Sequence, residues 1–429
     1  MTGTTTHEVA PSAARLTGSL RDIGYDFPTA VADLVDNSIA AGASRINVFT
    51  HFEPNGSYVL ISDDGAGMSE SELIEALRFG TRRTYATNEL GRFGLGLKTG
   101  SFSQCRRLTV VTRTSMKQRV IRVMTLDLNR IAKTDRWDIT ANETSPAIDR
   151  AKAILRESPG TVVVWEDLDR VLPERYAENG WGRRRLRSLA SKTAEHLAMV
   201  FHRFIAGDVP GRTEVIICVD EEKLRPWDPF APGEVERKVL PEQVFEVDTM
   251  EGTSEVRFRG VVLPARDRFS SIEEFERLSG PLKWNRQQGL YVYRANRLVQ
   301  HGGWSGLRGI DEHMKLARAA IDFDTDLDEA FQINVAKMSV DLPPAVRKML
   351  ERPVQELCVL ADDAYRRSAN SGGRSPSATK ASRVSETALR DVSIAIKAAM
   401  LEGNSLPEFR AAMERLREHN PDLARLLNL

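Results

Sequence analysis

A glycine-rich stretch near residue 95 constrains the fold of this chain more than any other feature. It reads Glu89-Leu-Gly-Arg-Phe-Gly-Leu-Gly-Leu-Lys-Thr-Gly-Ser-Phe-Ser103 and contains one lysine, Lys98. Glycine adopts positive φ at little cost and lets main-chain N–H groups approach an anion closely. A helix beginning near Leu97 would direct its positive end at the same anion. The stretch therefore predicts a loop that holds a polyphosphate.

Two familiar phosphate-binding loops do not match this stretch. A Walker A loop requires Gly-Lys-Ser/Thr in direct succession, whereas Leu97 separates Gly96 from Lys98. The dinucleotide fingerprint requires a third glycine at the position that Thr99 occupies. Such a loop is as often a structural turn, so its interpretation depends on the flanking motifs.

The composition is that of a globular protein with room for two or three domains. The chain has 429 residues, 41% apolar and 28% charged, and its 60 basic residues balance its 60 acidic ones. A net charge of zero does not by itself demand a nucleic acid or an anionic membrane. Three cysteines far apart in sequence exclude a short-spaced metal knuckle and fit a reducing compartment. Without a signal-peptide core or a long apolar window, we expect a cytoplasmic protein that does not span a membrane.

A helix of about four turns is predicted from Asp26 to Gly42. Pro28 suits its first turn and Gly42 its C-terminal end. Asp33 and Asn37, four residues apart, lie on the side opposite the apolar residues of this helix. Their oxygens suit a Mg²⁺ ion that keeps most of its waters and also binds substrate phosphates. The alternative, a solvated helix face, stays open at this point.

A further carboxylate follows a predicted strand over residues 58–62. Asp63 opens the run Asp63-Asp-Gly-Ala-Gly-Met68, which contains Gly65 and Gly67. The carboxylate can accept a hydrogen bond from an exocyclic amine of a nucleobase, and the two glycines let a flat ring lie against the backbone. An ordinary Asp/Gly turn is the other reading of this run.

The remaining elements of the first half predict an α+β fold. Ser69 and Glu72 form a capping box at the start of a helix. Polar residues 80–88 are interpreted as a lid over the glycine-rich stretch. Helices and a largely antiparallel set of strands are segregated along the chain rather than alternating, which argues against a doubly wound sheet. The predicted helices cover residues 69–79 and 147–157, and residues 13–20 are either a short helix or an arm. The predicted strands cover residues 45–51, 106–114, 120–128 and 161–166.

The second half is predicted as a separate domain beginning near residue 205, since the helix over residues 189–204 leads through a strand into a proline-bounded loop. Ser- and Gly-rich residues 368–383 are expected to be a linker, and residues 384–429 a helical tail for dimerisation or partner docking. His196 and His202 do not share a helix face and are interpreted as ordinary core or surface residues. Further strands are predicted over residues 214–219, 256–263, 289–293, 297–299 and 317–323, with helices over residues 272–278 and 343–367.

Four motifs stand in a fixed order along the first 161 residues. They are Asp33-x-x-x-Asn37, Asp63-x-Gly65-x-Gly67, Gly91-x-x-Gly94-x-Gly96-x-Lys98 and Gly160-Thr161. This set resembles the GHKL ATPases, the ATP-binding fold of gyrase, heat-shock chaperones, histidine kinases and MutL. The phrases Val35-Asp-Asn-Ser-Ile39 and Leu90-Gly-Arg-Phe-Gly-Leu-Gly-Leu-Lys98 are most similar to MORC-type ATPases and their bacterial relatives. The resemblance covers about residues 15–350.

The resemblance implies a fold and two ligands, ATP and Mg²⁺. Residues 1–205 would form a Bergerat-type sandwich of helices on a mixed sheet, and residues 206–367 a ribosomal-S5-like transducer domain. Asn37 would bind the metal, Asp63 would bond the adenine amino group, and Thr161 would support that contact. The residues implied to contact the nucleotide are Asn37, Asp63, Gly65, Gly67, Met68, Gly91, Arg92, Phe93, Gly94, Leu95, Gly96, Leu97, Lys98 and Thr161.

Two residues are implied to be catalytic. The family's general base is a glutamate at the position of Asp33, whose side chain is one methylene shorter. A positioned general base contributes roughly 10²- to 10⁴-fold, so we expect slow hydrolysis. Lys337 is the candidate for the transducer lysine that reaches the γ-phosphate, with a surface lysine as the alternative. Lys98 and Lys337 together would neutralise the phosphate charge.

The function implied is ATP binding and slow hydrolysis that drive lid closure and dimerisation, in DNA restriction, phage defence or repair. A nucleotide-responsive assembly module with little ATPase activity is the alternative. A histidine kinase is disfavoured, because kinases place this module last. The best nucleic-acid patch is Arg183-Arg-Arg-Leu-Arg187 with Lys192, for which a solvated helix face is the favoured reading.

Overall fold

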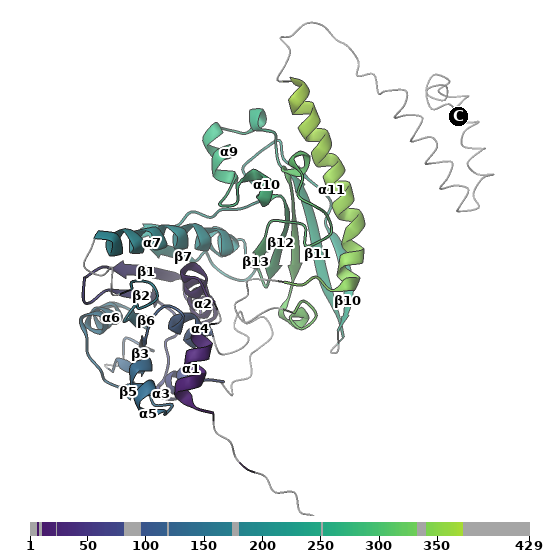
Figure 1. The fold of residues 1–429 in the computed structure, drawn as a ribbon. Coiled ribbons are helices and arrows are strands. Elements are labelled where there is room, and N and C mark those ends of the chain that lie inside the picture. The colour runs from purple at the N-terminus through teal and green to yellow at the C-terminus, as the bar shows by residue number, and fades with distance from the viewer. Residues whose placement is uncertain are drawn as a thin grey trace, which may run out of the picture. The chain divides into compact units, whose positions relative to one another are not determined.

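The computed structural model describes residues 7, 11–22, 24–80, 96–117, 120–173, 180–249, 252–332 and 340–371. One compact unit, Met1–Ala369, contains two β-sheets, and a second unit begins at Asn370 (Figure 1). Most of the predicted linker and the whole predicted helical tail lie outside the described residues.

The first sheet has eight strands in the order β5-β4-β3-β6-β2-β1-β7-β8. Neighbouring strands are antiparallel except for β1 and β7, which are parallel. A mixed sheet with helices along its faces confirms the predicted α+β class. The strand bounds are β1 Arg45–His51, β2 Tyr58–Asp63, β3 Arg107–Arg113, β4 Arg122–Asp127, β5 Thr140–Ala141, β6 Gly160–Glu166, β7 Ile216–Val219 and β8 Glu222–Lys223.

The first sheet continues beyond residue 205, where the sequence predicted a domain boundary. Strand β7 joins β1 in parallel and β8 extends it as a hairpin, so the change to the second sheet falls between Lys223 and Lys238. The pairing of β7 with β1 is a long-range contact. The local pattern around residue 205, a long helix followed by a strand and prolines, carries no sign of it.

Helices cover both faces of the first sheet, and each face has its own core. Because side chains alternate along a strand, Val59 and Ile61 of β2 join the core shared with α2 and α7, whereas Tyr58 and Leu60 join the smaller core that contains α6. Helix α7 starts well before the predicted residue 189, and the helix α5 was not predicted. The helix bounds are α1 Ala13–Arg21, α2 Phe27–Ala40, α3 Glu70–Leu77, α4 Gly96–Phe102, α5 Leu128–Thr134, α6 Pro146–Glu157, α7 Gly180–Val200 and α8 His202–Ala206.

The second sheet has the order β10-β11-β14-β12-β13, with β9 paired to β11 and with β12 and β14 parallel. Helix α11 buries Val346, Leu350, Val354 and Leu357 in the core of this sheet at helical spacing. The strand bounds are β9 Lys238–Val239, β10 Gln243–Thr249, β11 Gly252–Val262, β12 Gly289–Arg294, β13 Arg297–His301 and β14 Ala317–Phe323. The helix bounds are α9 Ile272–Leu278, α10 Lys283–Gln287 and α11 Pro344–Ser371, with short 3₁₀ turns η2 Arg266–Arg268, η3 Glu312–Met314 and η4 Thr325–Leu327.

None of the helices in the described part of the chain is both long enough and apolar enough to cross a lipid bilayer.

Candidate functional site

Helix α2 carries the first two predicted site residues, Asp33 and Asn37. The Asp26 carboxylate caps its N-terminus by accepting the Thr29 N–H at 2.9 Å, and Gly42 follows its end at a φ of +79°. Asp33 is buried, with 3% of its surface exposed, whereas Asn37 is exposed. The two residues predicted to share one polar face therefore differ in exposure. Asp33 lies in the interior because α2 is packed on several sides, whereas Asn37 faces outward.

Asp63 lies at the end of β2 and is held by three donors. The Ser38 hydroxyl donates to its Oδ2 at 2.9 Å, and the N–H groups of Gly65 and Thr161 donate to its Oδ1 at 2.9 and 3.2 Å. Burial raises the pKa of Asp63, while these hydrogen bonds oppose the change. The network joins α2, the turn after β2 and the start of β6 at one carboxylate.

Gly67 stands where a side chain would collide with the neighbouring strand. Its φ is +66°, and a Cβ built there would lie 2.4 Å from the main-chain oxygen of Arg113. The next residue, Met68, donates its N–H to the Thr112 hydroxyl at 2.9 Å, and that hydroxyl lies 3.2 Å from the Thr161 hydroxyl. Thr112 was not predicted as a site residue, since a threonine inside a strand gives no local signal.

Gly96, the first described residue of the glycine-rich stretch, lies against Asp33. A Cβ built on Gly96 would be 3.2 Å from Oδ2 of Asp33, so a residue without a side chain allows this approach. Helix α4, which begins here, lies beside α2 (Figure 1). Two distant segments of the chain therefore meet at the Asp33 carboxylate.

Tyr25 is a further neighbour of Asp33 that sequence reasoning missed. Its side chain is buried, and its hydroxyl interacts with the Asp33 carboxylate and with Thr99 of α4. Burial raises the pKa of Tyr25 above its ordinary value, and the charge of Asp33 acts in the same direction. A neutral hydroxyl thus lies beside the predicted general base.

Lys98 was predicted to face the phosphates, and the structure places its ammonium at the end of α3. Its Nζ donates to the carbonyl oxygen of Ala76 at 2.9 Å, where carbonyl groups at a helix C-terminus attract a cation. Burial lowers the pKa of Lys98 to about 8, and the charge of Glu75 opposes this change. Helix α3 begins at the predicted capping box of Ser69 and Glu72.

Several predicted residues lie outside the described residues. These are Gly91, Arg92, Phe93, Gly94 and Leu95, nearly all of the predicted lid, and Lys337. Leu97 is described and packs against the first core.

The side chains described at this site offer oxygen donors, the type of ligand that a magnesium ion takes. Within the described ranges, no group of three or more His, Cys, Asp or Glu side chains is placed to hold a metal. Magnesium takes one or two protein oxygens and completes its shell with phosphate oxygens and water. The exposed Asn37 amide can supply such an oxygen.

A family model described as "Histidine kinase-, DNA gyrase B-, and HSP90-like ATPase" matches residues 25–161. This range starts at Tyr25, ends at Thr161 and contains α2, the end of β2 and the glycine-rich stretch. These residues form a GHKL ATPase domain. The resemblance drawn from the four motifs is confirmed.

Part of this chain is also similar to parts of three animal proteins. It is 35% identical over 85 residues to ATPase morc-1 of Caenorhabditis elegans and 39% identical over 77 residues to ATPase MORC2 of Homo sapiens. It is 40% identical over 77 residues to MORC family CW-type zinc finger protein 1 of Mus musculus. The matches cover 20% or 17% of this chain and 10% or 8% of the relatives, so the chain spans about a tenth of their length.

Proposed function

We propose that this protein binds Mg-ATP through its GHKL domain and hydrolyses it slowly. The observation that supports this best is the convergence of three sequence motifs on helix α2. Gly96 of the glycine-rich stretch lies against Asp33, and Asp63 accepts the hydroxyl of Ser38, which directly follows Asn37. An ATP molecule needs an anchor for adenine, a metal ligand and a general base within one short span, and α2 joins these three.

Each residue then has a defined task. Asp63 accepts a hydrogen bond from the adenine amino group, and Asn37 would hold Mg²⁺, which would supply positive charge to the phosphates. Asp33 orients the attacking water and accepts its proton. Because aspartate is shorter than the family's glutamate, the water is held less closely and turnover is slow. Lys337 is proposed to reach the γ-phosphate.

Two substitutions on α2 test this proposal. Asn37→Ala should abolish the thermal stabilisation by Mg-ATP, which for a ligand at about 100 times its dissociation constant is roughly 2.7 kcal/mol. Asp33→Asn should keep that stabilisation and lower the turnover rate by roughly 10²- to 10⁴-fold, because it removes a base without changing shape. Asp149→Asn, an exposed change on α6, is the control. If both α2 variants hydrolyse ATP like the wild type, the site assignment is wrong.

The alternative function, an assembly module that holds ATP with little hydrolysis, rests on Asp33 in place of glutamate. Asp33→Glu separates the two functions. A large gain in turnover indicates that the natural chain is adapted to retain ATP. We further propose that the ATP-bound form is a homodimer, which light scattering with ATP and with ADP measures.

The second sheet is proposed as the transducer domain, and the physiological setting is proposed to be DNA restriction, phage defence or repair.

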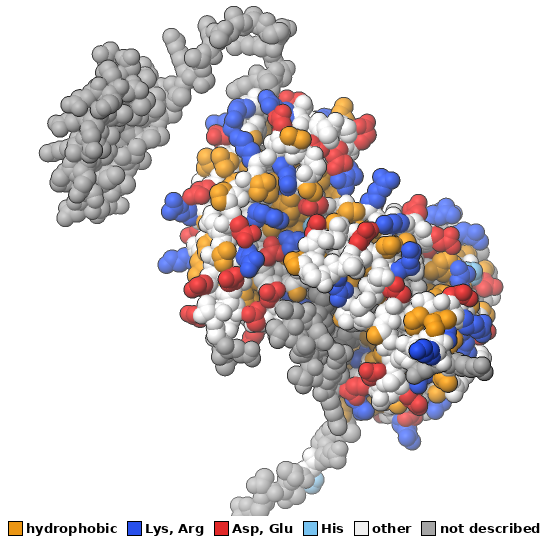
Figure 2. Space-filling model, turned by 180° about the vertical axis from the view of Figure 1, so that it is seen from behind, with side chains coloured by type: hydrophobic (Ala, Val, Ile, Leu, Met, Phe, Trp, Pro, Cys, Tyr) orange, Lys and Arg blue, Asp and Glu red, His pale blue; other side chains and the backbone are white. Residues whose placement is uncertain are grey.

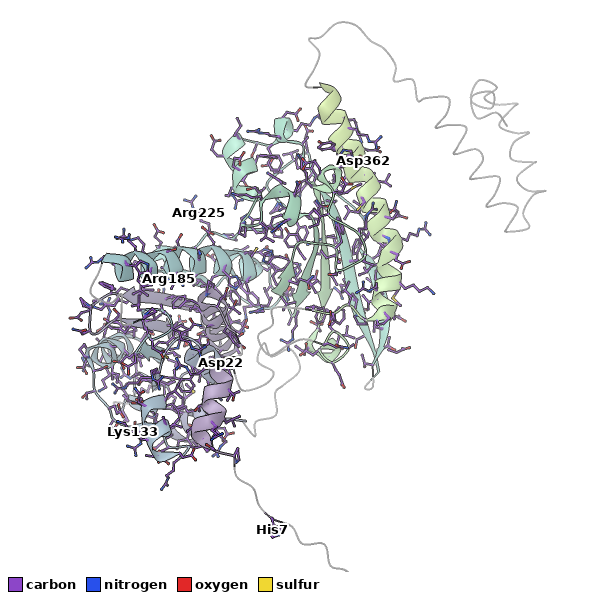
Figure 3. The ribbon with its side chains drawn as sticks, viewed as in Figure 1. His7, Asp22, Lys133, Arg185, Arg225 and Asp362 are labelled. Carbon is purple, nitrogen blue, oxygen red and sulfur yellow. The ribbon has the colours of Figure 1, made fainter. Side chains whose placement is uncertain are left out.

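A DNA contact would have to come from a local group of basic residues, because Lys and Arg are interspersed with Asp and Glu over the face shown in Figure 2. The basic residues of α7 are exposed, and one of them, Arg185, is labelled in Figure 3. A cytoplasmic location is proposed because all three cysteines are buried and free.

A further inference from the structure

We propose that Arg297 of the second sheet is a positioning residue for the magnesium ligand Asn37, acting through a buried ion pair with Asp36. The inference rests on the proposed Mg-ATP site. Arg297 begins strand β13, and its Nε lies 3.1 Å from the Asp36 carboxylate. Asp36 directly precedes Asn37 in α2. A residue of the second sheet thus holds the helix of the ATPase domain beside its metal ligand.

The hairpin turn that carries Arg297 packs against the ATPase domain. Its two central residues, Ala295 and Asn296, have φ values of +45° and +68°, the signs that a tight two-residue hairpin turn requires. Ala295 packs against the hydrophobic core of the first sheet. The turn therefore has a defined backbone conformation and packs at a defined place against the domain that contains α2.

The other end of the same turn is fixed within the second domain. Nε and Nη2 of Arg294 donate to the two carboxylate oxygens of Asp328 at 2.5 and 2.6 Å, and both side chains are buried. Two-pronged arginine–carboxylate pairs fix orientation as well as distance. Arg294 thus anchors the turn to its own domain, while Arg297 reaches α2. The turn is a short, rigid connection between the two.

The Asp36–Arg297 pair is more than a general stabiliser of the fold. Asp36 has no exposed surface and Arg297 only 2%, so both charges are removed from water. A buried ion pair often contributes less to stability than apolar residues of the same volume, and what it supplies is a fixed geometry. Asn37 is exposed, so its orientation depends on the placement of α2 rather than on packing of its own side chain.

The surroundings keep this pair intact at neutral pH. His196 of α7 is a titratable side chain that feels the charges of both Arg297 and Asp36. Burial lowers the pKa of His196 to about 4, and the charge of Arg297 acts in the same direction. His196 is therefore neutral near pH 7 and does not compete with Arg297 for Asp36.

A magnesium titration of the full chain tests the proposal. Arg297→Gln should raise the Mg²⁺ concentration for half-maximal ATP-dependent stabilisation by roughly tenfold to hundredfold, the usual effect of removing a residue that orients a metal ligand. ATP binding without Mg²⁺ should change less than about twofold, because the adenine contacts of Asp63 are untouched. Arg297→Lys, which keeps the charge, should give an intermediate shift. Asp36→Asn combined with Arg297→Gln leaves no unpaired charge and should recover stability, but it should not restore the wild-type Mg²⁺ dependence, because the ion pair that positions α2 is absent.

A second ion pair between the two sheets is the matched control. Arg203 of α8 donates from two guanidinium nitrogens to the two carboxylate oxygens of Asp322 in β14. Its guanidinium also lies 3.5 Å from the centre of the Tyr293 ring. Arg203→Gln should lower the melting temperature and leave the Mg²⁺ dependence unchanged. The proposal is overturned if Arg203→Gln shifts the Mg²⁺ dependence as far as Arg297→Gln, or if Arg297→Gln does not shift it. Failure of the wild type to bind Mg-ATP would instead refute the proposed function.

Discussion

Gly160 fixes the position of the predicted adenine anchor. It begins β6, directly before Thr161, and adopts a φ of +141°, where side chains are strained. A Cβ at this position would lie 1.9 Å from the main-chain oxygen of Asp63, so β2 would have to move. Steric contact with β2 therefore explains why the Gly-Thr motif has glycine at this position, independently of any contact with a ligand.

Gly160→Ala is expected to lower both stability and ATP binding. The strained backbone alone costs on the order of 1–3 kcal/mol. The displacement of β2 adds to this cost and moves the Asp63 carboxylate. Gly252→Ala separates the two effects, because Gly252 has a φ of +140° and, among the described residues other than its chain neighbours, no atom lies within 4 Å of the added Cβ. Melting temperatures with and without Mg-ATP are the measurement. Equal losses for the two variants would show that the contact with Asp63 does not matter.

At the scale of elements, the short helices and loops around α2 determine what the site can do. Lys98 in α4 donates a hydrogen bond to the Ala76 carbonyl at the end of α3, and its ammonium group is therefore buried away from solvent. Helix α7 packs along the same face of the first sheet and leaves one basic side exposed. We have proposed that the first element acts on the nucleotide and the second on DNA.

The exposed side of α7 is expected to contribute phosphate contacts if DNA is bound. Arg185→Gln combined with Lys192→Gln should reduce the slope of log affinity against log salt by about 2, since each neutralised phosphate contributes roughly 0.9. Lys133→Gln combined with Lys348→Gln removes the same charge from exposed positions elsewhere and is the control. Binding to duplex DNA at several salt concentrations measures the slope. An unchanged slope in the α7 variant would assign its basic residues to solvation alone.

At the scale of the whole molecule, buried polar contacts join the two sheets, and one of them is sensitive to acid. Nε2 of His202 lies 2.9 Å from the Tyr293 hydroxyl, and its Nδ1 has no hydrogen-bond partner among the described residues. Burial lowers the pKa of His202 to about 3, and the charges of Arg203 and Arg259 act in the same direction while Asp322 opposes them. His202 is therefore neutral in the folded protein at pH 5.

Stability is expected to fall as the pH is lowered from about 6.5 toward 3. Over this window the unfolded chain binds a proton at His202 that the folded chain does not, so unfolding is favoured by acid. At pH 5 the loss attributable to this residue is about 2 kcal/mol. Urea unfolding of the wild type and of His202→Gln at pH 7.5 and 5 measures it. His51→Gln, a substitution at a more exposed histidine, is the control and should keep the wild-type dependence of stability on pH. A His202→Gln variant that keeps the full acid sensitivity would contradict this.

Local sequence determined the elements and several of the contacts around Asp63. The cap and the proline of α2, the capping box of α3 and the apolar, strand-forming runs of β2 and β6 are set by residues a few positions apart, because backbone hydrogen bonds and side-chain direction are short-range. Asp63, Gly65 and Thr161 were therefore predicted and are found together. Their order along the chain also indicated the GHKL family, which the family model confirms.

Tertiary structure decided what no short pattern records. The pairing of β7 with β1, the burial of Asp33 and the carbonyl that holds Lys98 all depend on segments that return to one place from far along the chain. The Asp36–Arg297 pair joins residues 261 positions apart. Such contacts follow from how whole sheets and helices exclude water together, so a carboxylate in a helix motif does not reveal which distant cation it will meet.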